Sequence, residues 1–238
     1  MASRDKAGRI CGMLLFAAFL LFHLSYLHKG WQHFDTAAKI NSLLITCTIT
    51  LFLSAYFLRT EAVLYTKGFT EAIYPLFCAA LPLVVYHDVE IFRIISPQSG
   101  YYGIAHSLFG TFSNKWLGWN IYSMALVITG NFIVLVGITY LRRSFSIMVE
   151  AREPVYTGVY QHIRHPLYLG ESVATLGVLF FRCSKANIFL TALFIACQAF
   201  RAHLEERKLM AAFPSYREYR KRTGAVLPKV WPKFRVNI

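Results

Sequence analysis

Long apolar runs separated by short polar segments constrain this chain more than any other feature of its sequence. The clearest run covers residues 121–141, and two others cover residues 10–27 and 40–58. A helix needs about 20 apolar residues to cross the hydrocarbon core of a bilayer. Inside that core the backbone polar groups must be satisfied within the protein, as they are in a helix. The runs therefore predict an all-α fold and a polytopic integral membrane protein.

The composition supports this fold class and gives the basic residues a location. The 238 residues are 56% hydrophobic and 16% charged, which is too apolar for an ordinary soluble domain. The formal net charge is +13, and residues 201–238 alone hold ten Lys or Arg and three Asp or Glu. A basic tail beside a membrane span is more typical of contact with anionic lipid than of nucleic-acid binding. We therefore expect membrane lipids, and no nucleic acid, among the partners.

Two further regions determine how many segments enter the bilayer. The run at residues 72–86 is short and contains Pro75 and Pro82, so we expect it to be kinked or to begin at the interface. After Glu171 the apolar character is interrupted only at residues 182–187, which predicts two helices joined by a tight turn. The total is six membrane segments, or five if the last two form one re-entrant hairpin.

The chain divides into two parts according to the motifs that it carries. Residues 1–120 hold N-terminal transmembrane segments and an aromatic connection at residues 87–120, whose rings favour the headgroup zone. Residues 121–238 hold the remaining spans, two polar motifs and the basic tail. In this second part, Gly130 and Gly137 lie a heptad apart, where a neighbouring helix can approach closely.

The cysteines and histidines indicate neither a disulfide framework nor a metal site. The five cysteines lie in or beside apolar runs and form no C-x-x-C pair, which is typical of small buried hydrophobic residues. His87, Asp88, Glu90 and His106 are of metal-ligating types, but their spacing matches no metal motif. We predict no bound metal.

The distribution of Lys and Arg among the connections predicts the orientation in the membrane. With the N-terminus inside, the inner segments are 1–9, 59–71, 142–171 and 201–238, and they carry most of the basic excess. Positive charge favours the cytoplasmic side of a membrane. We therefore expect both termini in the cytoplasm, and the size of the chain without targeting signals favours a bacterial inner membrane.

One polar motif, Arg164-His165-Pro166-Leu167-Tyr168-Leu169-Gly170-Glu171, stands where a basic loop meets an apolar run. A residue before proline favours extended backbone, and proline suits the first turn of a helix, so we expect a helix to begin at Pro166. The unpaired N–H groups of a helix start suit an anion, and Gly170 allows a close approach to the backbone. The alternative is a capped membrane helix whose Arg164 and His165 extend to the headgroups.

The second polar motif, Arg201 with Glu205 and Glu206, lies where the last apolar run ends. The two motifs therefore face the cytoplasm at opposite ends of one helical hairpin. Carboxylates this close to the bilayer are costly unless they are paired or liganded, which makes them functional candidates. The alternative is a salt bridge between Arg201 and Glu205, which are four residues apart on one helix face. Two carboxylates and an arginine can hold a zwitterionic or cationic cofactor, and the spacing alone names none.

The order and spacing of these motifs resemble the C-terminal half of the isoprenylcysteine carboxyl methyltransferase family, a group that includes phospholipid and small-thiol methyltransferases. The resemblance covers residues 142–228 and implies an all-helical membrane enzyme that uses S-adenosylmethionine (AdoMet) without a Rossmann domain. It rests on Thr157-Gly158-Val159-Tyr160, on residues 164–170, on Arg201 with Glu205 and Glu206, and on Tyr216 and Tyr219 followed by Lys221 and Arg222.

The resemblance also implies roles for individual residues. The catalytic residues are Arg201, which faces the reacting group of the acceptor, and Glu206, which supports Arg201. AdoMet enters from the cytoplasm, and a lipophilic or small acceptor enters from the bilayer with a carboxyl, thiol or amine group. The cofactor-binding residues are Val155, Tyr160, Arg164, His165, Pro166, Leu167, Tyr168, Gly170 and Glu205.

The sequence departs from the family pattern at two places. Glu171 and Ser172 stand where the prenylcysteine enzymes have aromatic residues, and Glu153-Pro154 replaces a polar-apolar pair before the loop glycine. Both places lie near the expected acceptor, which weighs against a prenylated protein as the acceptor. The position of Glu171 raises the hypothesis that its carboxylate acts as a base or binds a cationic head group.

Two other functions are compatible with the same motifs. Sterol reductases have a distantly similar C-terminal core, so the polar motifs can instead be read as a site for NADPH in a membrane reductase. A non-catalytic membrane scaffold or small transporter, with both motifs as interfacial anchors, is the second alternative. The occurrence of both motifs at the ends of one hairpin weighs against the non-catalytic alternative.

Overall fold

The computed structural model describes residues 2–32, 34, 36–86, 117–181 and 183–229. Within these ranges the chain is helical and contains no strand, which confirms the predicted fold class. The expected aromatic connection, with His87, Asp88, Glu90 and His106, lies almost wholly outside the described residues.

Eight α-helices and two short 3-10 helices make up the described structure. They are α1 (Ala2–Gly30), α2 (Thr36–Leu58), α3 (Gly68–Ala72), α4 (Tyr74–Tyr86), α7 (Leu117–Leu141), η2 (Arg142–Ser144), η3 (Gly158–Gln161), α8 (Pro166–Phe181), α9 (Lys185–Ala212) and α10 (Tyr216–Arg222).

Four of these helices are long and apolar enough to cross a membrane. Their spans are Gly8–Lys29, Lys39–Leu58, Ile121–Ser144 and Lys185–Ala212. The helices α4 and α8 are apolar but shorter. With them, the described part of the chain has six apolar helices, and α8 and α9 are separate helices as the polar break predicted.

The short apolar run at residues 72–86 begins with a break in the helix, as its prolines predicted. The chain leaves α3 at Ala72 and enters α4 at Tyr74, so Pro75 stands in the first turn, where no N–H donor is required. Pro82 lies inside α4. The described part of α4 has 13 residues, and the residues that follow Tyr86 lie outside the described ranges.

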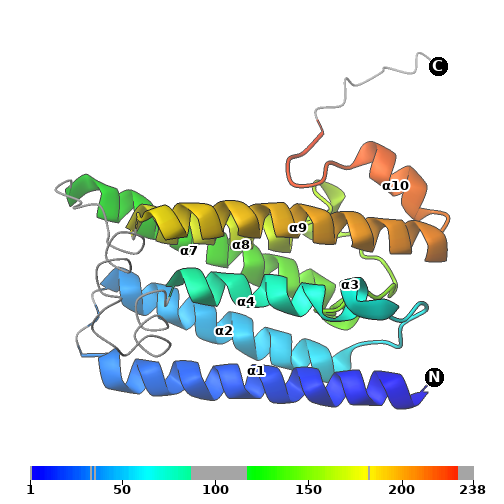
Figure 1. The fold of residues 1–238 in the computed structure, drawn as a ribbon, viewed down its shortest axis with the longest axis horizontal. Helices are drawn as coiled ribbons and strands as arrows, with labels where there is room; N and C mark the ends of the chain where they lie inside the picture. The colour runs from blue at the N-terminus through cyan, green and yellow to red at the C-terminus, as the bar shows by residue number, and fades with distance from the viewer. Residues whose placement is uncertain (1, 33, 35, 87–116, 182, 230–238) are drawn as a thin grey trace, which may run out of the picture.

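The long helices lie side by side, and the polar motifs gather at one end of the bundle (Figure 1). This end holds the N-terminus of α1, the C-terminal ends of α2 and α9, and α10. The loop that follows η2 is joined to the chain after α2 by backbone hydrogen bonds. Val63 N donates to Ala151 O at 2.7 Å, and Ala151 N donates to Leu64 O at 2.9 Å.

The helices α7 and α8 pack backbone against backbone because glycines face the contact. A Cβ atom at Gly130 would lie 2.4 Å from the backbone N of Ala174 and 2.5 Å from the carbonyl of Gly170. A Cβ atom at Gly137 would lie 2.4 Å from Leu167 Cδ1. The prediction that a neighbouring helix approaches both Gly130 and Gly137 is therefore confirmed.

Replacing Gly130 with leucine should separate α7 from α8, because backbone atoms of α8 occupy the place of the new side chain. We expect a loss of about 1–3 kcal/mol in the free energy of unfolding, as for other overpacked contacts. The matched control is Ala125→Leu, since Ala125 lies on an exposed face of the same helix. Thermal unfolding in detergent, followed by size-exclusion fluorescence, measures both variants, and equal melting temperatures would contradict the packing argument.

Candidate functional site

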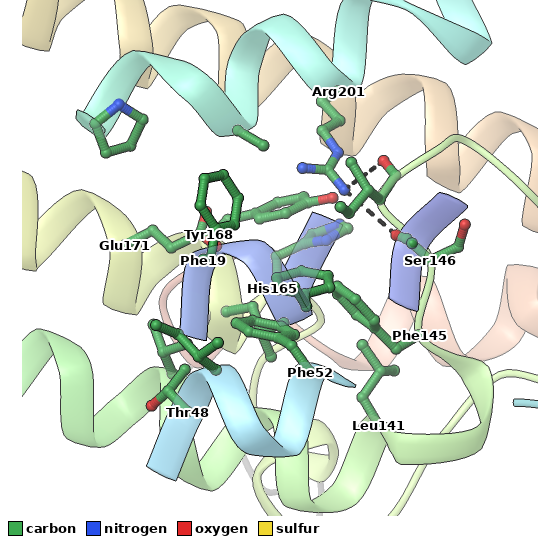
Figure 2. A pocket seen from close by; sticks show the side chains of 18 of the residues that line it. Phe19, Thr48, Phe52, Leu141, Phe145, Ser146, His165, Tyr168, Glu171 and Arg201 are labelled. Carbon is green, nitrogen blue, oxygen red and sulfur yellow. Dashed lines mark hydrogen bonds between the residues drawn. The ribbon is translucent and has the colours of Figure 1, made fainter. Parts of the chain in front are cut away.

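A cavity of about 880 Å³ lies among the membrane helices and the loop at residues 144–155. Its walls come from α1, α2, α4, α7, α8 and α9, so both halves of the chain contribute. One end is polar and contains Arg201 and Glu205 (Figure 2). A cavity of this size is typical of cofactor and small-molecule sites. The rest is lined mainly by apolar side chains, which include Phe16, Phe19, Phe52, Leu76, Val134 and Val178.

Arg201, on α9, is the centre of the polar end. Its Nη2 donates to the backbone carbonyls of Ile147 at 2.7 Å and Ser146 at 3.4 Å, which Figure 2 shows as dashed lines. Its Nε donates to Glu205 Oε1 at 3.2 Å, and its Cζ lies 5.0 Å from the ring centroid of Tyr168. The hydroxyl of Tyr168 donates to the same oxygen of Glu205. We call Arg201, Glu205 and Tyr168 the Arg201 unit.

Glu206, the next residue of α9, belongs to a different cluster. Its Oε1 accepts hydrogen bonds from Arg164 Nε at 2.7 Å and His165 Nε2 at 3.0 Å, and its Oε2 accepts from Arg220 Nε at 2.6 Å. The side chains of Glu206 and Arg164 are each only 8% exposed. Buried charges are tolerated where they are paired and fully hydrogen-bonded. Glu206 therefore ties α9 to the start of α8 and to α10.

The backbone before α8 is held by the segment that follows α10. Arg164 N donates to Gly224 O, and His165 N donates to Ala225 O, each at 2.9 Å. Arg164 Nη1 also donates to the carbonyl of Thr223. Pro166 is the first residue of α8, as predicted. The start of α8 is thus fixed by main-chain contacts as well as by Glu206.

Aromatic side chains fill the space around this helix start. The rings of His165 and Tyr168 are stacked, with centroids 5.3 Å apart and planes 3° from parallel. The hydroxyl of Tyr219 donates to the carbonyl of Tyr160 at 2.5 Å. Burial raises the pKa of both Tyr160 and Tyr219 above the usual value, so both phenols stay protonated and Tyr219 remains a donor.

The structure brings most of the predicted site residues to the cavity, but not all of them. Pro166, Gly170 and Glu206 do not line it: Gly170 contacts Gly130 of α7 instead, and Glu206 faces Arg164 and His165. The predicted residues that line the cavity are Val155, Tyr160, Arg164, His165, Leu167, Tyr168, Arg201 and Glu205.

Sequence reasoning missed residues 145–147 of the loop and the N-terminal helices that complete the site. Phe145 packs against Phe52 and Tyr56, with ring centroids 4.7 Å and 5.7 Å away, and Ile147 N donates to the Tyr56 hydroxyl at 3.1 Å. The helices α1 and α2 therefore hold the loop whose carbonyls bind Arg201. No residue type marks a backbone carbonyl, so this contact leaves no signal in the sequence.

Gln198 is a second residue that the motifs did not include. It lies on α9, is buried, and donates a hydrogen bond to Glu171 Oε2. A polar residue inside an apolar run was the available signal, since polar groups within the bilayer are rare and face an interior or a cavity.

The fold and the site define a helical membrane protein with a cavity that is polar at one end and apolar over most of its length. Residues 119–216 match the family model of the phospholipid methyltransferases. The match begins in α7 and contains the Arg201 unit and Glu206, which confirms the resemblance read from the motifs. No curated protein matches the chain.

Replacing Glu206 with glutamine should destabilise the fold, because the buried side chains of Arg164 and His165 lose the carboxylate that accepts their hydrogen bonds. Breaking a buried ion pair from one side costs about 3–5 kcal/mol. The matched control is Glu218→Gln, since the side chain of Glu218 is 55% exposed in its pairs with Lys221 and Arg222. We expect a change of less than about 1 kcal/mol there. Chemical unfolding in detergent compares the two variants, and similar losses would contradict the role of Glu206.

Proposed function

We propose that this protein is an AdoMet-dependent membrane methyltransferase that transfers a methyl group to the carboxyl, thiol or amine of a lipophilic or small acceptor. The observation that carries the proposal is the Arg201 unit. It lies within the family-matched segment and at the polar end of a mostly apolar cavity. A charged cofactor and a lipophilic acceptor need such a pair of environments in one cavity.

The residues at the polar end fit AdoMet by their chemistry. AdoMet has a cationic sulfonium and ammonium, a carboxylate and an aromatic base. The carboxylate of Glu205 suits the cationic groups, Arg201 and Arg164 suit the carboxylate, and the stacked rings of His165 and Tyr168 offer an aromatic surface. Val155, Tyr160 and Leu167 complete this part of the wall. When bound, AdoMet supplies a methyl group that its sulfonium already activates.

The protein therefore has to position the reactants and keep water away from them. Arg201 is held by two loop carbonyls and by Glu205, so its guanidinium is oriented before any ligand binds. Phe19, Phe52 and Phe145 close the neighbouring wall with apolar surface (Figure 2). A fixed geometry in a dry site is the main requirement for an in-line methyl transfer. Glu206 acts as a positioning residue through Arg164 and His165.

We expect AdoMet and its demethylated product to raise the melting temperature of the purified protein in detergent, and NADPH to leave it unchanged. A ligand at 100 times its Kd stabilises the native state by about 2.7 kcal/mol. Glu205→Gln and Tyr168→Phe should reduce the shift, because both alter the Arg201 unit. Glu218→Gln, on the exposed face of α10, should retain it.

Each other outcome of this experiment favours a different function. Stabilisation by NADPH alone would favour the reductase. Stabilisation by neither ligand, with unchanged melting temperatures for the Glu205 and Tyr168 variants, would favour a non-catalytic scaffold.

The proposed function also includes an orientation, with both termini in the cytoplasm of a bacterial cell and the polar end of the bundle at the inner surface of the inner membrane. The described part of the basic tail, up to residue 229, and the two polar motifs lie at this end, where the proposed orientation makes soluble cofactor and anionic lipid headgroups available. A green fluorescent protein fused to either end should fluoresce, whereas alkaline phosphatase in the same places should be inactive. Active phosphatase at the C-terminus would reverse the orientation.

A further inference from the structure

The cavity contains a second group of polar side chains, which the proposed methyl transfer does not use. His23 of α1, Asn41 and Thr48 of α2, and Asn131 of α7 line its wall among apolar neighbours. Polar residues inside membrane helices are rare and face an interior or a cavity, which makes them functional candidates. We call these four side chains the distal group.

The distal group lies far from Arg201 along the helices. Tyr56 of α2 accepts from the backbone of Ile147, whose carbonyl in turn accepts from Arg201. On the same helix, Thr48 precedes Tyr56 by eight residues and Asn41 precedes it by fifteen. At about 1.5 Å per residue, these offsets correspond to roughly 12 Å and 22 Å along the helix axis. Figure 2 shows Thr48 and Arg201 on opposite sides of the pocket, with aromatic side chains between them.

Hydrogen bonds between three helices hold the distal group together. Asn131 Nδ2 donates to Asn41 Oδ1 at 2.8 Å, and His23 Nε2 donates to the backbone carbonyl of Ser42 at 3.1 Å. A side-chain amide has two donor and two acceptor positions, and the contact between Asn41 and Asn131 uses one position of each. The NH2 group of Asn41 and the carbonyl oxygen of Asn131 can therefore bind a further polar group in the cavity.

The hydroxyl of Thr48 is the observation that points to a ligand. The hydroxyls of Thr46 and Thr50, on the same helix, donate to the carbonyls four residues earlier at 2.8 Å each. Thr48 is only 7% exposed, and among the described residues its Oγ1 atom has no hydrogen-bond partner. A buried hydroxyl that makes no hydrogen bond is costly. A polar group bound in the cavity offsets this cost.

Charge separates the two ends of the cavity. Its charged lining residues come from the loop at residues 144–155, from Arg164, and from α8 and α9. Among the described residues that line it from α1, α2, α4 and α7, there is no Asp, Glu, Lys or Arg. Burying an ion without a counter-charge is costly, so the distal group suits an uncharged polar group. A hydroxyl both donates and accepts, which matches the donors of Asn41, the acceptor of Asn131 and the hydroxyl of Thr48.

We propose that the distal group is a second binding subsite, and that the acceptor is an amphiphile with two polar ends. Its reacting group lies at the Arg201 unit, and a hydroxyl at the far end of its chain binds Asn41, Thr48 and Asn131. The apolar wall between the two ends, which includes Phe16, Phe19 and Phe52, covers the chain. The inference rests on the proposed function only in calling this ligand the methyl acceptor.

The test uses pairs of probes that differ only at the far end of the chain. They are hexadecanoic acid, hexadecanethiol and hexadecylamine, each with and without a hydroxyl on the last carbon. Three reacting groups are used so that the result does not depend on which of them is methylated. Binding to the full chain in lipid nanodiscs is measured by displacement of the tritiated hydroxyl probe of the same pair. Absence of specific binding for all three pairs would overturn the inference.

The decisive variant is Thr48→Val, which keeps the shape of the side chain and removes its hydroxyl. In at least one pair, we expect the gain in affinity from the probe's hydroxyl to be about three- to tenfold larger in the wild type than in this variant. Partitioning into lipid is the same for every variant, so this ratio reports the subsite. The matched control is Thr50→Val, since Thr50 lies on an exposed face of the same helix and should retain the gain.

Melting temperatures separate recognition from a structural role. Thr48→Val should leave the melting temperature unchanged or raise it, because this hydroxyl has no partner among the described residues. Asn131→Leu should also lose the gain from the probe's hydroxyl. If the asparagines only joined α2 to α7, Asn131→Leu would lower the melting temperature with this gain intact. That result, or an unchanged gain in Thr48→Val, would overturn the inference, and Thr48→Val alone decides if Asn131→Leu does not fold.

The outcome also distinguishes this inference from the proposed function. If AdoMet stabilises the protein but Thr48→Val binds both members of every pair as the wild type does, the distal subsite is wrong and the methyltransferase stands. If the gain from the probe's hydroxyl depends on Thr48 while AdoMet has no effect, the methyltransferase proposal fails and the distal subsite stands.

Discussion

The buried carboxylate of Glu206 is the contact on which the polar end of the protein depends. It accepts hydrogen bonds from Arg164 and His165 in the loop before α8 and from Arg220 of α10, so one side chain joins α9 to two other segments. Removing a charge from water costs several kcal/mol, which only a full set of partners offsets. The segments are therefore held in one arrangement, and the face that Arg201 and Glu205 present to the cavity is oriented with them.

The same end depends on helices outside the family-matched segment. Tyr56 of α2 accepts from the backbone of Ile147, whose carbonyl in turn accepts from Arg201. Phe16, Phe52 and Phe145 pack around this contact. The family match begins at residue 119, yet the orientation of Arg201 is determined by α1 and α2 as well. The N-terminal half thus lines part of the cavity and helps to hold Arg201 in its orientation.

Features that depend on local chemistry were predictable from the sequence. The long spans follow from the length and hydrophobicity of single runs, the start of α8 follows from Pro166, and the pair of Arg201 with Glu205 follows from helix spacing. Features that depend on distant partners were not. Gly170 was expected near a cofactor but contacts α7, and Glu206 was expected beside Arg201 but binds Arg164. Neither partner is close in the sequence, and both residues had more than one chemically reasonable place.

The glycine contact between α7 and α8 has a consequence for how a ligand reaches the cavity. Where backbone touches backbone, with Gly130 against Gly170 and Ala174, no side chain can rotate to open a gap. These two helices form a fixed wall that can shift only as one body. The rest of the wall, from α1, α2, α4 and α9, meets the cavity through side chains that can change rotamer. Any rearrangement that widens the cavity is therefore expected in these helices and not at the contact between α7 and α8.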